Sequence, residues 1–328
     1  MARGLTTLPD EMINWVDHGK VVSVMPTDNN EVQELIQGMP NGSLIVATNE
    51  EESNDTSIMK HGINVPILTN GLHLYVNPDT GNDSNDGSIN YPFRTINHAL
   101  QYCCRYTPGI YYATIVINLA PGTYNELIIS SVGCYKGNLL LQGYGVDNTI
   151  INGGLQVYNN LSGNLHLSNI TIQSDINNGN NGITLHIDTA RVFLQDTVRL
   201  INNGDGTTTG AVINVSGCGC IHNTHGLYLD VVLNNSRTFI DCWKLGQVHF
   251  AETTINLNGN VYSHTMIVTT NAVAVLDYAY NLRFTGNVTG SRFLVNGGGN
   301  IATNGGGLEF IPGTVAGIID TNTGGIYT

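Results

Sequence analysis

A repeat of about 27 residues in the second half of the chain is the feature that most constrains its fold. Six short segments start 26 to 28 residues apart, and most of them alternate apolar and polar side chains. Alternation predicts β-strands with one apolar face. A unit this short buries that face only by stacking on copies of itself. The six segments are Leu165–Asn169, Val192–Asp196, Cys220–Thr224, Val248–Glu252, Ala274–Tyr278 and Asn300–Asn304.

Each repeat contains further strand-like segments between these six. Second strands are predicted at Ile183–Ile187, Ala211–Val215 and Thr238–Cys242, and third strands follow the same period. Three short strands per repeat, joined by turns, are typical of a coil of a parallel β-helix. Coils stack about 4.8 Å apart, so six to eight of them span roughly 30–40 Å. The prediction is therefore an all-β, single-stranded parallel β-helix.

The chain divides into four parts by this pattern. Residues 1–70 lack the repeat and are predicted to be an N-terminal attachment segment. Residues 71–135 form the N-terminal cap and first coil, 136–298 the coils, and 299–328 the last coil and C-terminal cap. An amphipathic helix is expected at Pro92–Cys103, where it would cover the open end of the first coil.

Charge and hydropathy exclude some classes of partner. The chain has 12 basic and 25 acidic residues, a net charge of −13 and no basic run. Nucleic acid is therefore not an expected partner. No apolar stretch reaches the roughly 18 residues that a membrane span needs, so no membrane insertion is expected. Six cysteines are too few for a disulfide scaffold, which predicts reduced thiols and synthesis in the cytoplasm.

Several segments resemble a known superfamily. Tyr75–Gly87 followed by Tyr91–Ile96 resembles the N-terminal cap of pectin-lyase-like right-handed β-helices, and Pro121–Glu126 and Leu140–Gly154 resemble their first coils. The C-terminal segments resemble the ends of bacteriophage and prophage tail proteins with this fold. Those segments are Phe310–Gly317 and Gly324–Tyr327.

The resemblance implies a homotrimeric tail spike, tail fibre or tail-tip protein located in the virion. In such a protein the N-terminal segment docks on other tail or baseplate proteins, and the β-helix contacts polysaccharide on the bacterial surface. Two alternatives remain open on the same fold. One is a polysaccharide depolymerase, either a glycoside hydrolase or a lyase, and the other is a purely structural tail component.

Glycoside hydrolysis requires two carboxyl groups, 5–5.5 Å apart for retention of configuration and 6.5–9.5 Å apart for inversion. The fifth positions of the repeat give Asp196 and Glu252, which lie two coils apart, or roughly 9–10 Å. Asp188 and Asp241 form a second candidate pair. Polar residues at the ends of strands are also typical of a turn ladder with a structural role, and that interpretation is favoured for both pairs.

Exposed tyrosines are the candidate glycan-binding residues, because a phenol ring stacks on a sugar and its hydroxyl forms hydrogen bonds. The candidates in or near the coils are Tyr228, Tyr262, Tyr278 and Tyr280. Filling of turns and subunit contacts is the alternative role. No cofactor or metal is expected. Cys218, Cys220, His222 and His225 have the residue types of a zinc site, but the register of the repeat favours core positions for Cys220 and His222. The aspartates Asp79, Asp83 and Asp86 are expected to form turns rather than a calcium site.

Overall fold

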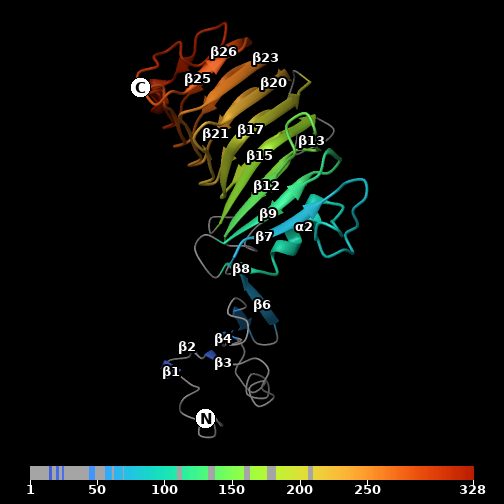
Figure 1. Cartoon of the computed structure of the whole chain (residues 1–328). Coiled ribbons are helices and arrows are strands. Elements are labelled where there is room, and N and C mark those ends of the chain that lie inside the picture. The colour runs from blue at the N-terminus through green and yellow to red at the C-terminus, as the bar shows by residue number, and fades with distance from the viewer. Residues whose placement is uncertain are drawn as a thin grey trace.

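The computed structural model describes residues 15–16, 20–21, 24–25, 44–48, 56–60, 63–68, 70–108, 113–131, 137–158, 163–175, 182–205 and 210–328. From residue 72 onward these residues form a right-handed parallel β-helix of about seven turns. Figure 1 shows the strands as parallel rungs from β7 at one end to β26 near the other. The predicted fold is confirmed.

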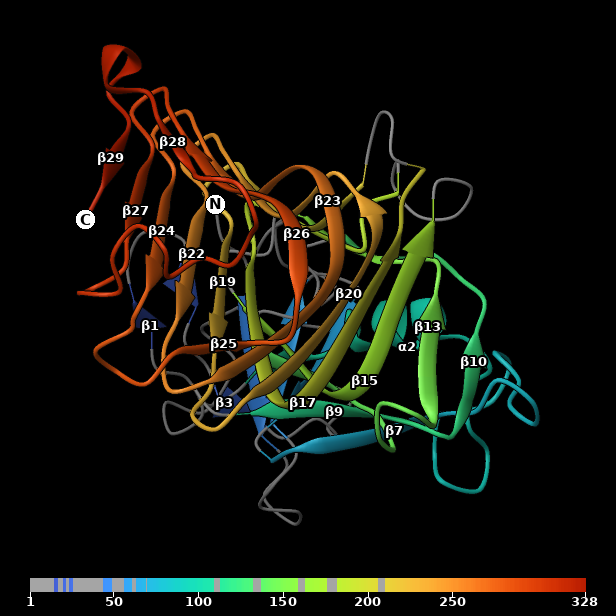
Figure 2. The same ribbon diagram turned by 90° about the horizontal axis from the view of Figure 1, so that it is seen from above.

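Three ladders of parallel strands form the sides of the β-helix, and Figure 2 shows them from above. The first ladder contains β7 (Leu72–Val76), β9 (Thr114–Leu119), β12 (Asn138–Gln142), the first parts of β15 (Asn164–Asp175) and β17 (Arg191–Asn203), β19 (Cys220–Asn223), β22 (Gln247–Phe250), β24 (Val273–Leu276), β27 (Asn300–Ala302) and β29 (Ile326–Tyr327).

The second and third ladders complete each turn. The second contains β10 (Gly122–Tyr124), β13 (Thr149–Asn152), the later parts of β15 and β17, β20 (Tyr228–Ser236), the first part of β23 (Thr254–Val268) and β25 (Arg283–Thr285). The third contains β11 (Ile128–Ser131), β14 (Leu155–Tyr158), β16 (Leu185–Asp188), β18 (Ala211–Ser216), β21 (Thr238–Cys242), the end of β23, β26 (Val288–Val295) and β28 (Ile318–Ile319).

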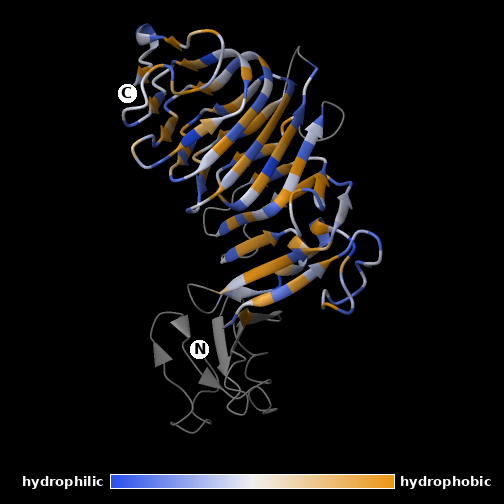
Figure 3. Ribbon diagram, turned by 45° about the horizontal axis from the view of Figure 1, so that its top comes forward, coloured by the Kyte–Doolittle hydropathy of each residue, from blue (hydrophilic) through white to orange (hydrophobic). Residues whose placement is uncertain are grey.

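The core is built from columns of equivalent apolar residues. Apolar and polar residues alternate along the strands in Figure 3, and the apolar positions point inward. On the third ladder the buried inward column consists of Leu155, Leu185, Ile213, Ile240, Met266 and Phe293. On the first ladder it consists of Leu165, Val192, Ile221, Val248, Ala274 and Ile301.

The first-ladder column corrects the predicted register at two repeats. Ile221, not Cys220, pairs with Val248, and Ile301, not Asn300, pairs with Ala274. At Ile221 the reason is that the step from its partner Val192 is longer than the average repeat, and at Ile301 the step from Ala274 is one residue longer than predicted. Side chains alternate along a strand, so a shift by one residue exchanges inside and outside. His222 is therefore an outward residue, and the prediction that it fills the core is wrong.

The corner between the second and third ladders contains a buried polar cluster. The amide nitrogen of Asn202 donates to the carbonyl of Gly182, to the hydroxyl of Thr184 at 3.1 Å and to that of Ser174 at 3.4 Å. Asn202 has no exposed surface. These bonds link the end of β17 to the turn before β16 and give the buried amide nitrogen its partners, whereas Oδ1 of Asn202 has no hydrogen-bond partner among the described residues.

The cap helix α2 (Ile96–Cys103) covers the first coil, as predicted. It begins at Ile96 rather than Pro92, because the side chain of Thr95 accepts the amide of His98 as an N-cap. Asp83 fixes the preceding turn by accepting the amides of Arg94 and Thr95, both at 2.9 Å. Buried side chains of the helix pack on the coil; these are Ile96, Ala99, Leu100 and Cys103.

Glu126, which precedes β11, also binds the N-terminus of α2. Its carboxylate accepts the amides of Ile96 at 2.8 Å and Asn97 at 3.2 Å. Exchange of Glu126 for Gln removes the charge that favours a helix N-terminus and leaves one acceptor oxygen. We expect the local stability of α2 to fall by about 1 kcal/mol. Faster hydrogen exchange at the Ile96 and Asn97 amides would show this, whereas Glu309→Gln, at an 88% exposed side chain, should leave both rates unchanged.

The described strands before residue 70 form two small sheets. β1 (Trp15–Val16) pairs with β2 (Lys20–Val21). β3 (Val24–Met25), β4 (Leu44–Thr48), β5 (Thr56–Lys60), β6 (Ile63–Leu68) and β8 (Thr107–Pro108) form a mixed sheet. Most of the predicted attachment segment lies outside the described residues. In the part of the chain that is described, no helix is long and apolar enough to cross a membrane.

Candidate functional site

The candidate carboxylates Asp196 and Glu252 lie at the bends between the first and second ladders. Both have a left-handed backbone, with φ of 56° and 49°, as does Asn169 with φ of 55°. Asp and Asn tolerate this conformation better than most residues. The repeated polar position therefore satisfies a backbone requirement of the bend.

Each of these two carboxylates is also engaged by a neighbouring coil. Asp196 accepts the hydroxyl of Ser168 at 2.5 Å, and Glu252 lies 2.5 Å from Nδ1 of His225. The residue of the preceding coil that contacts Glu252 is thus His225, and not Thr224, the fifth position of the predicted repeat. The structure gives Asp196 and Glu252 separate local partners, as the structural turn ladder requires.

The possible metal ligands do not come together. Among the described residues, no group of three or more His, Cys, Asp or Glu side chains is placed to hold a metal ion. Cys218, Cys220 and Cys242 are free thiols, whereas Cys104 is part of a disulfide bond, so the prediction of reduced thiols is wrong for Cys104. In the cap loop, Asp83 and Asp86 accept local backbone amides, as expected of turns.

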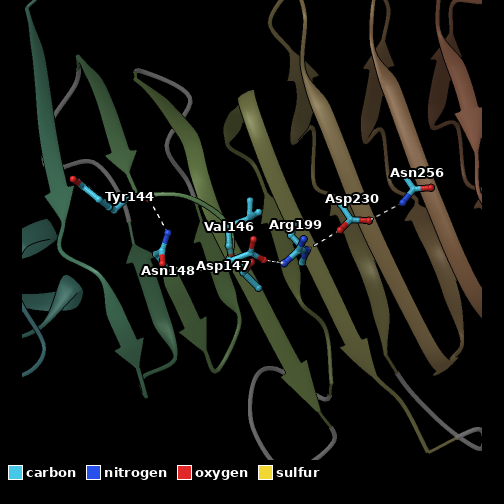
Figure 4. Close-up of polar contacts among 8 residues, drawn as sticks. Tyr144, Val146, Asp147, Asn148, Arg199, Asp230 and Asn256 are labelled. Carbon is cyan, nitrogen blue, oxygen red and sulfur yellow. Dashed lines mark hydrogen bonds and ion pairs between the residues drawn. The ribbon is translucent and has the colours of Figure 1, made fainter.

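A row of polar side chains crosses the outer face of the second ladder (Figure 4). Arg199 lies between two carboxylates, with Nη1 2.5 Å from Asp147 and Nε 2.7 Å from Asp230. These bonds raise the pKa of Arg199, with Asp147 contributing most. Asn256 continues the row by donating to Asp230 at 3.0 Å, and Thr285 donates to Asn256 at 3.2 Å. The row joins successive coils, and its charged groups pair with one another. We therefore assign it a structural role.

Three of the four candidate tyrosines gather on one edge between the first and second ladders. Tyr228 shares an outward column with Arg283, two coils away. The Arg283 guanidinium lies 4.8 Å from the ring centre of Tyr278, which in turn makes an edge contact with Phe310 at 5.4 Å. The carbonyl of Tyr280 accepts the amide of Glu252, and Tyr280 is 63% exposed. We call Tyr228, Tyr278, Tyr280, Arg283 and Phe310 the tyrosine edge.

Tyr262 lies apart from this edge. It belongs to the part of β23 that turns from the second ladder into the third. Burial raises the pKa of Tyr262, and the positive charge of nearby Arg237 partly opposes this effect. Tyr262 therefore belongs with residues of the third ladder.

The outer face of the third ladder carries Asp188 and Asp241. Asp241 shares a column with Gln156, His186 and Asn214, and alternation with the buried core column directs these side chains outward. Asp188 is in the next column, so strand spacing and rise place its Cα about 12 Å from that of Asp241. That separation does not support a hydrolytic pair.

Although they point outward, the residues of this column are covered by neighbouring side chains. Asp241 is only 9% exposed, and burial raises its pKa despite an ion pair of 2.6 Å with Arg237. Burial also lowers the pKa of His186, whose ring packs 5.3 Å from that of Tyr158. The face therefore has two layers, a buried polar layer and a more accessible layer of aromatic and cationic side chains.

Sequence reasoning identified Asp188 and Asp241 as acidic residues but missed Arg237, Trp243 and Lys244 beside them. A search for cations and aromatic residues in the turns that flank Thr238–Cys242 would have found these three. No family model, curated protein or solved structure matches this chain.

Proposed function

We propose that the protein is a trimeric tail spike, tail fibre or tail-tip protein of a bacteriophage and recognises polysaccharide on the host surface. The tyrosine edge is the observation that supports this function best. It combines exposed rings, which stack on sugars, with the Arg283 guanidinium, whose N–H groups are donors of the kind that sugar hydroxyls accept. Residues 1–70 would attach the protein to other tail or baseplate proteins of the virion.

The β-helix also fits this role mechanically. Its parallel ladders link every coil to its neighbours along the stack, so a load on one end is carried by many backbone hydrogen bonds. Lateral association of three copies would add burial that a thin stack lacks by itself. Light scattering of the full chain should give the mass of three copies, and a monomer would contradict the trimer.

Removal of the rings of the tyrosine edge should weaken binding of the host glycan. We expect Tyr278→Ala combined with Tyr280→Ala to weaken binding to an array of bacterial capsular and lipopolysaccharides by about tenfold or more, because each lost aromatic contact costs roughly 1 kcal/mol. Tyr91→Ala is the matched control, since Tyr91 is 62% exposed on the cap loop.

The same array separates the alternatives. Binding that the paired substitution leaves unchanged would exclude the tyrosine edge, and absence of binding to any glycan would favour a purely structural tail component. Release of new reducing ends or unsaturated uronates would identify a depolymerase. Loss of binding in Tyr91→Ala as well would indicate a general effect on folding.

A further inference from the structure

The outer face of the third ladder holds two cations, each anchored by a neighbouring side chain. Arg237 is fixed by Asp241, its partner four residues later at 2.6 Å. Lys244 lies with its ammonium 4.1 Å from the ring centre of Trp243. The indole nitrogen of Trp243 points at the side-chain oxygen of Asn214, 3.5 Å away. Anchoring by Asp241 and Trp243 limits the side-chain freedom that a ligand would otherwise have to restrict.

Both cations retain capacity for a ligand. A guanidinium has five N–H donors, and among the described side chains Arg237 donates only to Asp241. No carboxylate in the described part of the chain lies within ion-pair distance of Lys244. Two cations with free donors on one coil are unusual in a chain with 12 basic and 25 acidic residues.

The turn that presents Lys244 has an unfavourable backbone. Lys244 and Leu245 both have a left-handed conformation, with φ of 49° and 66°. Backbone hydrogen bonds align this turn with Gly217–Cys218 on the preceding coil and with Thr270–Asn271 on the next. The following coil uses Gly297–Gly298, which adopts positive φ without strain. A lysine and a leucine at this position are therefore poor choices for folding.

Aromatic surface extends the face along the axis. Tyr158, Asp188 and Ser216 form one outward column, and Trp243 follows them on the next coil. Tyr158 and Trp243 are thus three coils, or about 14 Å, apart. The hydroxyl of Tyr158 donates a hydrogen bond of 2.6 Å to the side-chain oxygen of Gln156, and this bond limits the movement of the ring.

We propose that this face is a second binding site, for an acidic polysaccharide whose carboxylates pair with Arg237 and Lys244. Guanidinium and ammonium groups bind carboxylates by charge-assisted hydrogen bonds, and the ring of Tyr158 packs against a sugar face. The Arg237 guanidinium reaches Asp241, three residues before Lys244, so the two cations are held on the order of 10 Å apart along the coil. The ligand is therefore at least a short oligosaccharide, since a uronic acid carries one carboxylate and pairing with both cations takes two. This site is separate from the tyrosine edge.

Binding of the full-length protein to polygalacturonate tests the proposal, with neutral dextran as the comparison polymer. We expect polygalacturonate to bind, added salt to weaken it, and dextran to bind at least tenfold more weakly. Arg237→Gln combined with Asp241→Asn removes the guanidinium without leaving a buried unpaired carboxylate. That variant and Lys244→Gly should each weaken binding by about tenfold or more.

Lys244→Gly gives a readout that a structural role would not give. Because glycine relieves the left-handed strain, the thermal midpoint should rise while binding falls. Arg191→Gln, at an exposed arginine on the first ladder, is the matched control and should retain full binding.

Two results would overturn the proposal. One is polygalacturonate binding that is absent or no stronger than that of dextran, and the other is binding that both variants retain. Tyr278→Ala with Tyr280→Ala should leave polygalacturonate binding intact. The second site and the proposed host recognition can therefore fail independently.

Discussion

Exchange of Asn202 for aspartate is expected to lower the free energy of unfolding by about 3–5 kcal/mol at pH 7, because it places an unpaired carboxylate in a fully buried corner. The amide nitrogen of Asn202 donates to the carbonyl of Gly182 and to the hydroxyls of Thr184 and Ser174. A carboxylate has no proton to donate, so the oxygen that replaces this nitrogen would face the Gly182 carbonyl.

The expected loss depends on pH in a way that identifies its cause. Burial without a cation raises the pKa of the introduced carboxyl above its value in the unfolded chain. The stability of the Asn202→Asp variant relative to the wild-type protein is therefore highest at low pH, where the introduced carboxyl is protonated. It decreases as pH rises through the folded-state pKa of that carboxyl. Chemical denaturation of both proteins at pH 4 and pH 7 should show a smaller difference at pH 4.

Asn203→Asp is the matched control for this substitution. Asn203 is the next residue along β17, it is exposed, and it accepts a hydrogen bond from Asn234 at 2.7 Å that a carboxylate can also accept. We expect a change within about 0.5 kcal/mol. Equal losses for the two variants would show that the corner cluster around Asn202 does not have the stabilising role described above.

The period of the sequence was sufficient to predict the β-helix, because stacking requires equivalent residues to recur once per coil. It did not predict the register at Cys220, since the length of a turn is not encoded in the alternation of the strands. The coil from Val192 to Ile221 is longer than the average repeat, and alternation alone cannot tell on which side of a turn the extra residues lie.

The candidate sites show the same limit. Tyr228, Tyr278 and Tyr280 were identified from residue type, and the corner between two ladders brings them together on one edge. The anchoring of Arg237 by Asp241 and the left-handed turn at Lys244 depend on which outward residues are covered. Burial of an outward side chain by its neighbours depends on the folded surface, so a single sequence does not predict it.

Acidification from pH 7 to pH 5.5 is expected to destabilise the protein through histidines whose pKa is lower in the folded chain than in the unfolded chain. On the first ladder His166 stacks on Phe193 at 4.9 Å, and Phe193 stacks on His222 at 5.4 Å. Burial is the largest cause of the lowered pKa of both histidines, and the charges of His249 and Arg191 add to the effect at His222. Burial lowers the pKa of His186 as well.

The direction of the effect follows from linkage. The unfolded chain binds protons at histidines below about pH 6.5, whereas the folded chain resists protonation of these three. Their contribution to stability is therefore complete above pH 6.5 and is lost as pH falls toward the folded-state pKa values. Each unit of pKa depression corresponds to about 1.4 kcal/mol. The raised pKa of Glu126 and that of Asp241 act in the opposite direction, because a raised carboxyl pKa stabilises the folded chain as pH falls.

Denaturation curves at pH 7, 6.5, 6 and 5.5 measure this loss, and single substitutions assign it. His222→Gln should reduce the dependence of stability on pH in this range, because one suppressed protonation is removed. A stability that is constant from pH 7 to 5.5, or a pH dependence that His222→Gln leaves unchanged, would contradict the burial of the His166–Phe193–His222 stack as the cause. The stack would then have to open to solvent far more readily than its packing between coils implies.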